Sequence, residues 1–212
     1  MGQAVPLRCV FEDDDLVVVD KPAGLLAVPG RGEAGADCLS AQVQAVYPDA
    51  QIVHRLDMAT SGLMVFARGT HNQRLLSQAF AARRVTKCYI AVVVGCIEGD
   101  AGEIALPLTA DWPNRPRQRV DANDGKPSLT RWRVLTRDGD RSTRLELEPV
   151  TGRTHQLRVH LQAIGHAIAG DALYADATAL ALAPRLLLHA TDLCLDHPLS
   201  GARVGWYSEP PF

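Results

Sequence analysis

Short runs of apolar residues, each closed by turn residues, recur along the chain and predict strands. Residues 16–19 form one such run, and DKPAG follows directly, where Pro22 fixes φ and Gly24 permits a left-handed turn residue. The other runs that predict strands are 52–53, 63–67, 89–94, 130–135, 144–147, 186–189 and 193–195.

Three other segments carry apolar residues at helical spacing. The first predicts a helix that begins after Asp37, which caps it, and ends before Pro48. The second predicts a helix that begins at Thr70. The third carries Leu157 on its apolar face, and Gly165 closes it as a left-handed residue.

Strands therefore outnumber helices, and several follow one another without a helix between them. This order predicts an α+β fold with a mixed, largely antiparallel central sheet flanked by helices and loops. No repeat or linker divides the sequence, so we expect one domain over residues 1–212. Residues 112–127 contain three prolines and four cationic side chains, which predicts a long exposed loop and a candidate binding element.

Composition excludes several classes of protein. With 212 residues, of which 47% are hydrophobic, the chain can bury enough surface to fold without disulfides or a structural metal. The apolar runs are far shorter than the roughly 20 residues of a membrane-spanning helix. The acidic N-terminal segment does not resemble a signal peptide, so we expect a cytoplasmic protein. The five cysteines include no CxxC pair, and reduced, mostly packed thiols are expected.

Charge is segregated along the chain although the formal net charge is only −2. Residues 53–90 carry six Arg or Lys against one Asp, and residues 111–144 carry nine against five. Basic stretches of this kind are either ordinary solvated faces or contacts for nucleic acid. Charge alone leaves both interpretations open.

The candidate chemistry lies in HRLDMATSG, residues 54–62, between two predicted strands. The chain has no GxGxxG, P-loop, GxSxG or HExxH motif, so the sites that those motifs mark are not indicated. Arg55 stands two residues before Asp57, and a neighbouring cation favours the ionised form of a carboxylate. Asp57 is therefore a candidate nucleophile or base, although such a pair can also simply stabilise a turn.

Four segments, in order along the chain, resemble the motifs of the RluA-type pseudouridine synthases. They are DKPAGL, HRLDMATSGL, KCYIAVVVG and TGRTHQLRVH. The resemblance extends over about residues 11–197, and DWPNRP is similar to a segment of the short, dual-specificity subgroup that acts on large-subunit rRNA and tRNA anticodon loops. Like that subgroup, the chain is expected to begin at the catalytic domain, without an S4-like RNA-binding module.

The resemblance implies a pseudouridine synthase catalytic fold and isomerisation of uridine within folded RNA, with no cofactor and no metal. It implies that Asp57 acts on C1′ of the ribose. It further implies that Tyr89 stacks on the base and takes the C5 proton, and that Arg158 pairs with Asp57. Arg55 would fill the gap that the flipped uridine leaves in its stack.

RNA is the partner that the resemblance implies, and we expect a monomer with no obligate protein partner and no membrane contact. Alternating arginines suit the phosphates of a single-stranded RNA loop. The candidate RNA contacts, besides Arg55, are Lys87, Arg115, Arg117 and Arg119.

Two alternatives remain open at this point. A non-catalytic RNA-binding module would keep the basic loop without needing Asp57, Tyr89 and Arg158 together. A metal-dependent hydrolase would use Asp57 with His155 and His160, but a five-residue spacing does not place two histidines on one helical face.

Overall fold

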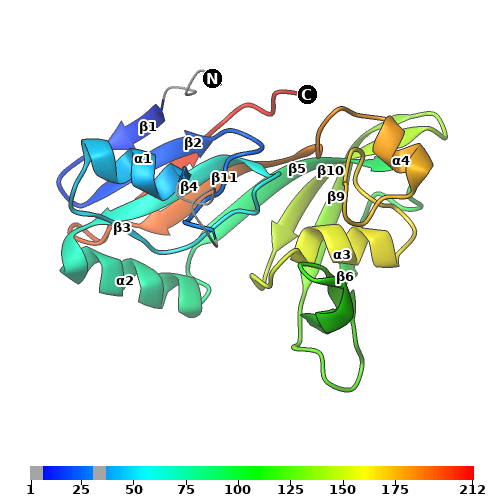
Figure 1. The fold of residues 1–212 in the computed structure, drawn as a ribbon, viewed down its shortest axis with the longest axis horizontal. Helices are drawn as coiled ribbons and strands as arrows, with labels where there is room; N and C mark the ends of the chain where they lie inside the picture. The colour runs from blue at the N-terminus through cyan, green and yellow to red at the C-terminus, as the bar shows by residue number, and fades with distance from the viewer. Residues whose placement is uncertain (1–6, 31–36) are drawn as a thin grey trace. The chain divides into compact units, whose positions relative to one another are not determined.

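A computed structural model describes residues 7–30 and 37–212 (Figure 1). The chain forms two compact units, the first from residues 1–87 and 190–211, and the second from residues 88–189 and 212. The chain passes between them within strands β5 (Thr86–Val94) and β11 (Leu188–Asp196). The single domain over residues 1–212 stays a prediction.

The first unit is built on the strand order β1-β2-β4-β11, in which β12 also pairs with β11 and β3 with β4. The neighbouring pairs β1–β2, β2–β4, β3–β4 and β11–β12 are antiparallel. Besides parts of β5 and β11, its elements are β1 (Arg8–Glu12), β2 (Leu16–Lys21), α1 (Leu39–Val46), β3 (Ala50–Ile52), β4 (Ser61–Arg68), α2 (Gly69–Ala81) and β12 (Arg203–Tyr207).

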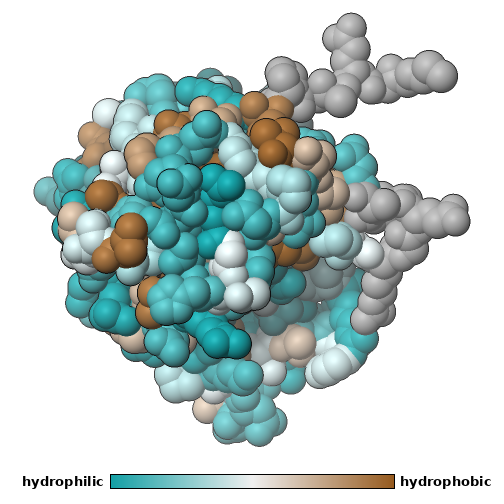
Figure 2. All heavy atoms as spheres, turned by 90° about the vertical axis from the view of Figure 1, so that its left-hand side faces the viewer, coloured by the Kyte–Doolittle hydropathy of each residue, from teal (hydrophilic) through white to brown (hydrophobic). Residues whose placement is uncertain are grey.

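The core of the first unit uses alternate strand positions. Leu16, Val65 and Leu193 belong to one buried cluster with Leu76 of α2, as the two-residue period of a strand requires. The intervening positions are buried as well, as Val17 of β2 shows at 0% exposure. This burial on both faces explains why the sequence of β2 begins with an unbroken apolar run. Figure 2 shows the left-hand side of Figure 1 as mostly hydrophilic, with apolar residues scattered across it.

The second unit is built on the strand order β5-β10-β9-β6, with β7 and β8 as a separate two-stranded sheet. Its neighbouring pairs are again antiparallel. Helix α3 packs against β8, β9 and β10. Besides β5, its elements are β6 (Ala101–Ile104), β7 (Leu108–Ala110), the 3-10 turn η2 (Trp112–Asn114), β8 (Gln118–Val120), β9 (Thr130–Asp138), β10 (Ser142–Pro149), α3 (Gln156–Ala163) and α4 (Ala177–Ala181).

The α+β prediction is confirmed, and so are the three helices, but several details were wrong. Cys38, not Asp37, is the N-cap of α1, and the Asp37 carboxylate instead accepts a hydrogen bond from the side chain of Gln42 at 3.1 Å. Helix α2 begins at Gly69, one residue before Thr70. The segment predicted as a long loop contains η2 and β8.

The last two predicted strands are one strand. Residues 186–189 and 193–195 were separated by a polar interruption, but Ala190 and Thr191 are buried within β11. The final strand is β12, which pairs with β11.

Two smaller expectations concern cysteine and membrane insertion. All five cysteines are reduced thiols, and three of them are buried or partly buried, as expected, whereas Cys9 and Cys96 are exposed. In the described ranges no helix is both long and apolar enough to span a bilayer.

Candidate active site

The loop that carries Asp57 connects β3 to β4 and is held by a buried lysine. Lys21 is 0% exposed. Its ammonium donates to the carbonyl oxygens of Pro22 at 2.9 Å, Leu25 at 2.7 Å and Met58 at 2.9 Å. An ammonium group has three N–H donors, so this geometry supplies an acceptor for each of them. Lys21 therefore fixes the residue next to Asp57 across 37 positions of sequence.

Backbone contacts fix the same loop at both ends. The N–H of Gly24, which has a φ of +86°, donates to the Met58 carbonyl at 2.8 Å. The N–H of Thr60 donates to the carbonyl of Asp57 at 3.1 Å. At the exit, Gly62 has a φ of +112°, and an added Cβ would lie 2.3 Å from the carbonyl oxygen of Ala190. The DKPAGL and HRLDMATSGL motifs thus form one structure that presents the partly buried Asp57.

His54 is a structural residue of this loop. Its Nε2 accepts the N–H of Val65 at 3.1 Å, and its ring stacks on Phe80 with centroids 4.5 Å apart. Burial, together with the charge of Lys87, lowers the pKa of His54 to about 3. The imidazole is therefore neutral near pH 7 and is not a general acid.

Lys87 lies near His54 at the end of the first unit. Burial lowers the pKa of its ammonium. Among the described residues it has no hydrogen-bond or ion-pair partner. Because Lys87 is only partly buried, its ammonium can reach an anionic ligand, which would offset the cost of its partial burial.

In the second unit, Tyr89 lies on β5 and Arg158 on α3. Tyr89 is partly buried and stands opposite Leu147 of β10. The Arg158 side chain is only 4% exposed, and its Nε and Nη2 each donate to a carboxylate oxygen of Asp171 at 2.7 Å. This bidentate geometry fixes the plane of the guanidinium. No sequence pattern pointed to Asp171, and the pairing of Arg158 with Asp57 stays a prediction.

Asp171 is itself held by Tyr174 and its neighbours. Asp171 Oδ1 accepts the backbone N–H of Tyr174 at 3.2 Å, and the Arg158 guanidinium lies 5.1 Å from the centroid of the Tyr174 ring. The Tyr174 hydroxyl accepts the N–H of Gln118 at 2.8 Å and bonds to Nδ1 of His155 at 2.7 Å. This network connects α3 to β8.

The histidines of the hydrolase alternative have other partners. His160 is 0% exposed, and its two ring nitrogens bond to Thr130 Oγ1 and to the Leu106 carbonyl, both at 2.9 Å. His155 uses Nδ1 for Tyr174. His160 thus has no nitrogen left for a metal, which removes one ligand of the proposed set.

The arginines of the predicted binding loop lie at η2 and β8, and all three are exposed. The guanidinium of Arg115 lies 3.2 Å from the centroid of the Trp112 ring. Arg117 lies 5.5 Å over the Tyr174 ring, and Arg119 forms an ion pair of 2.8 Å with Asp121. Exposed ion pairs of this type are weak and exchange readily for other anions.

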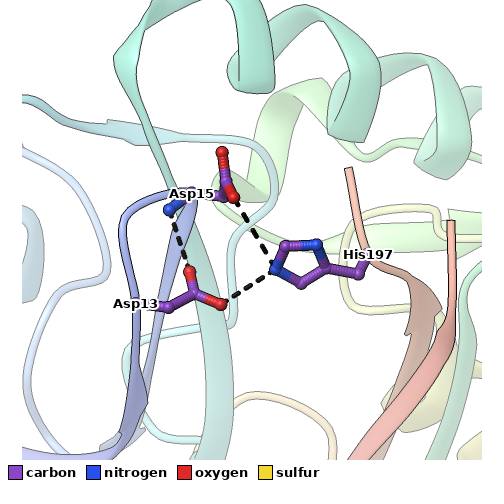
Figure 3. A group of neighbouring side chains, drawn as sticks. All are labelled: Asp13, Asp15 and His197. Carbon is purple, nitrogen blue, oxygen red and sulfur yellow. Dashed lines mark hydrogen bonds and ion pairs between the residues drawn. The ribbon is translucent and has the colours of Figure 1, made fainter. Parts of the chain in front are cut away.

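One further cluster has the spacing of metal ligands. Asp13, Asp15 and His197 place ligand atoms within 4.8 Å of one another (Figure 3). His197 Nδ1 faces the backbone N–H groups of Leu199 and Ser200 at 3.3 Å, so it accepts, and the proton on Nε2 is donated to Asp13 at 2.8 Å. Both nitrogens are engaged, and the cluster connects the β1–β2 turn to the segment after β11.

Comparison with known proteins assigns the chain to a family. The sequence pattern of the family described as RNA pseudouridylate synthase matches residues 15–163. The chain belongs to the RNA pseudouridylate synthase family. The prediction of an RluA-type synthase, and with it the enzyme class, is confirmed. The matched segment of this synthase contains Asp57, Tyr89 and Arg158.

Individual relatives agree with the family assignment. The synthase is 48% identical to the "Dual-specificity RNA pseudouridine synthase RluA" of Yersinia pestis over 203 residues, which cover 96% of this chain and 98% of that protein. Identity to the protein of the same name from Escherichia coli K12 is also 48%, over 92% of this chain and 89% of the relative. The solved structure of human RNA pseudouridylate synthase domain containing 1 covers 100% of this chain and 87% of its own, with 29% identity and a TM-score of 0.81.

Proposed function

We propose that this synthase isomerises a specific uridine to pseudouridine in folded RNA, either large-subunit rRNA, a tRNA anticodon loop or both. In the reaction the N1–C1′ bond breaks, the uracil rotates, C5 bonds to C1′, and the proton lost from C5 is balanced by one gained at N1. The reaction requires a carboxylate held in position and a uracil that stays bound while it rotates, and it requires no redox partner. The observation that carries the proposal is the anchored loop, in which Lys21 and Gly24 fix the position beside Asp57.

The reacting groups follow the family resemblance. Asp57 acts on C1′, Tyr89 stacks on the base and takes the C5 proton, and Arg158 holds the Asp57 carboxylate ionised and oriented. Arg55 is exposed and has no partner among the described residues, which suits a side chain that enters the gap left by a flipped nucleotide.

RNA contacts extend the proposal to the basic side chains. Lys87 takes a phosphate, because its ammonium is partly buried and has no anionic partner in the described part of the chain. Arg115, Arg117 and Arg119 take phosphates of the RNA loop from an exposed position. We further propose that residues 1–212 act as one catalytic domain, as a cytoplasmic monomer without cofactor or metal.

Asp57→Asn is the direct test of the reaction. The substitution keeps the shape of the side chain and removes its charge, so it abolishes pseudouridine formation and leaves RNA affinity within about twofold. Release of tritium from RNA labelled at uridine C5 measures turnover, and fluorescence anisotropy measures binding.

Asp14→Asn is the matched control, because its carboxylate is fully exposed in the same unit. It keeps wild-type turnover. Wild-type turnover by the Asp57→Asn variant would refute the role of Asp57. Cleavage of the RNA without tritium release, stopped by EDTA, would favour the hydrolase alternative. Tight RNA binding with neither cleavage nor tritium release would favour the binding module.

The salt dependence of RNA binding tests the arginine contacts. Replacing Arg115, Arg117 and Arg119 by alanine removes up to three phosphate contacts, so the slope of log affinity against log salt falls by about two. A triple variant of the exposed arginines Arg131, Arg133 and Arg141 on the same unit is the control. If both triple variants reduce the slope equally, the contact is not specific to η2 and β8.

A further inference from the structure

The turn between β7 and β8 presents a large, exposed aromatic side chain. Trp112 is 67% exposed, more than any other Phe, Trp or Tyr among the described residues. Tryptophan is highly buried on average, so an indole this exposed indicates a contact with a ligand or partner. In Figure 1 the segment from β7 to β8 lies below α3.

The turn that holds Trp112 is closed by its own hydrogen bonds. The N–H of Asn114 donates to the Asp111 carbonyl, the N–H of Arg117 to the Asn114 carbonyl, and the N–H of Asp111 to the Arg117 carbonyl, each at 3.0 Å. The side-chain amide of Asn114 donates to the Asp111 carboxylate at 2.9 Å. A fixed turn presents the indole with little conformational entropy left to lose on binding.

One face of the indole already carries a cation. The Arg115 guanidinium lies 3.2 Å from the ring centroid, which is stacking distance. Because the residue nevertheless remains 67% exposed, the opposite face of the ring is open to solvent. The open face of the Trp112 indole can therefore stack against one planar ring.

The surroundings favour a nucleobase over a protein surface. Arg117 and Arg119 are exposed on the same hairpin, and cations beside an aromatic ring suit the backbone of a single strand whose base stacks on that ring. Val120, at 37%, is the other large exposed hydrophobic residue described on this hairpin. A protein interface needs on the order of 800 Å² from each partner, much of it apolar, which this charged turn does not offer.

We propose that the open face of Trp112 is a stacking site for one unpaired base of the RNA substrate, with Arg115 on the other side of the ring. This inference rests on the proposed function and adds a base contact to the phosphate contacts of the hairpin. It makes the synthase favour an RNA loop over a duplex, because a paired base has no free face to offer.

The test compares Trp112→Ala, Trp112→Phe and the wild-type protein on two RNAs, a stem-loop and a blunt duplex with the same stem. Base stacking on an aromatic ring predicts about a 10-fold loss of stem-loop affinity for Trp112→Ala and a smaller loss for Trp112→Phe. Duplex affinity stays the same for all three proteins. Tyr207→Ala is the control, since Tyr207 is 57% exposed in the other unit, and it keeps wild-type affinity for both RNAs.

Abasic nucleotides then locate the stacked base. At one loop position the abasic RNA weakens binding to the wild-type protein by the same factor as Trp112→Ala, and the two changes together cost no more than either alone. Equal losses on stem-loop and duplex, unchanged stem-loop affinity, or additive losses at every loop position would overturn the stacking site. Tritium release from the same stem-loop is measured separately, so failure of the proposed reaction is distinguished from failure of the site.

Discussion

The two units keep a basic side chain buried in different ways. In the first unit the ammonium of Lys21 bonds to three backbone carbonyls, which are dipoles without net charge. In the second unit the guanidinium of Arg158 bonds to the carboxylate of Asp171, so the buried charge meets an opposite charge. Both groups are nearly or fully inaccessible, at 0% for Lys21 and 4% for the Arg158 side chain.

The difference shows what each cation positions. A cation held by carbonyls fixes the backbone that supplies them, and here that backbone runs beside Asp57. A cation held by a bidentate carboxylate is itself fixed, and here that cation is the proposed partner of the reacting group. The first unit therefore orients a loop, whereas the second orients a side chain.

Removing Asp171 is expected to have the largest effect on stability. Asp171→Ala removes the bidentate carboxylate that the buried Arg158 guanidinium binds and lowers the free energy of unfolding by about 3–5 kcal/mol. Asp171→Asn keeps an acceptor and costs less. Urea denaturation measures both, and Asp124→Ala, at an exposed carboxylate of the same unit, is the control. If Asp171→Ala is as stable as this control, the pair does not hold Arg158.

Compared with Asp171→Ala, removing the ammonium of Lys21 is expected to lower the free energy of unfolding less and turnover more. Lys21→Met keeps the length of the side chain but leaves three carbonyls without a donor, which costs about 3 kcal/mol. Turnover falls further than the unfolded fraction explains, because the loop of Asp57 loses its anchor. Lys126→Met, at an exposed lysine, leaves the free energy of unfolding unchanged.

Urea denaturation and tritium release at a temperature where both lysine variants are folded separate the two effects. A Lys21→Met protein with wild-type turnover would show that the ammonium stabilises the unit without orienting the loop.

The smallest effect is a pH dependence in the first unit. With its pKa near 3, His54 stays neutral in the folded protein at a pH where the unfolded chain, with a histidine pKa near 6.5, binds a proton. Stability from this residue is therefore complete above about pH 6.5, and it falls by about 1.4 kcal/mol per pH unit as the pH drops towards 3. Denaturation at pH 5 and pH 7 should show a steeper loss of stability in the wild type than in His54→Gln, which keeps the contribution of His160, whose pKa burial also lowers. An identical slope in both proteins would contradict the assignment.

Local patterns predicted much of this structure, because they report local forces. The apolar run of β2, the left-handed Gly165 that follows α3, and the place of Asp57 between two strands all depend on residues close in sequence. Motif resemblance added the family, which spacing alone could not supply.

Long-range contacts account for what the sequence analysis missed. The partner of Arg158 lies 13 residues away in a segment without regular structure, and Lys21 reaches Met58 across 37 residues. Neither distance is set by a local period. Trp112 had a weak signal, since a tryptophan between an aspartate and a proline in a basic loop has no apolar neighbours to pack against, but its exposure depends on how the turn closes.

The first unit contains chain from both ends of the sequence. Its strand β4 has β11 as a neighbour, and β12 pairs with β11, so the sheet is complete only when residues 190–207 are present. During synthesis on the ribosome, residues 16–68 emerge long before that strand exists, whereas the second unit is continuous over residues 88–189. The nascent chain must therefore carry residues 61–65 of β4, which β3 does not pair, without their β11 neighbour until residues 190–196 have been translated. A premature stop codon upstream of residue 190 would leave this edge of β4 without β11 permanently.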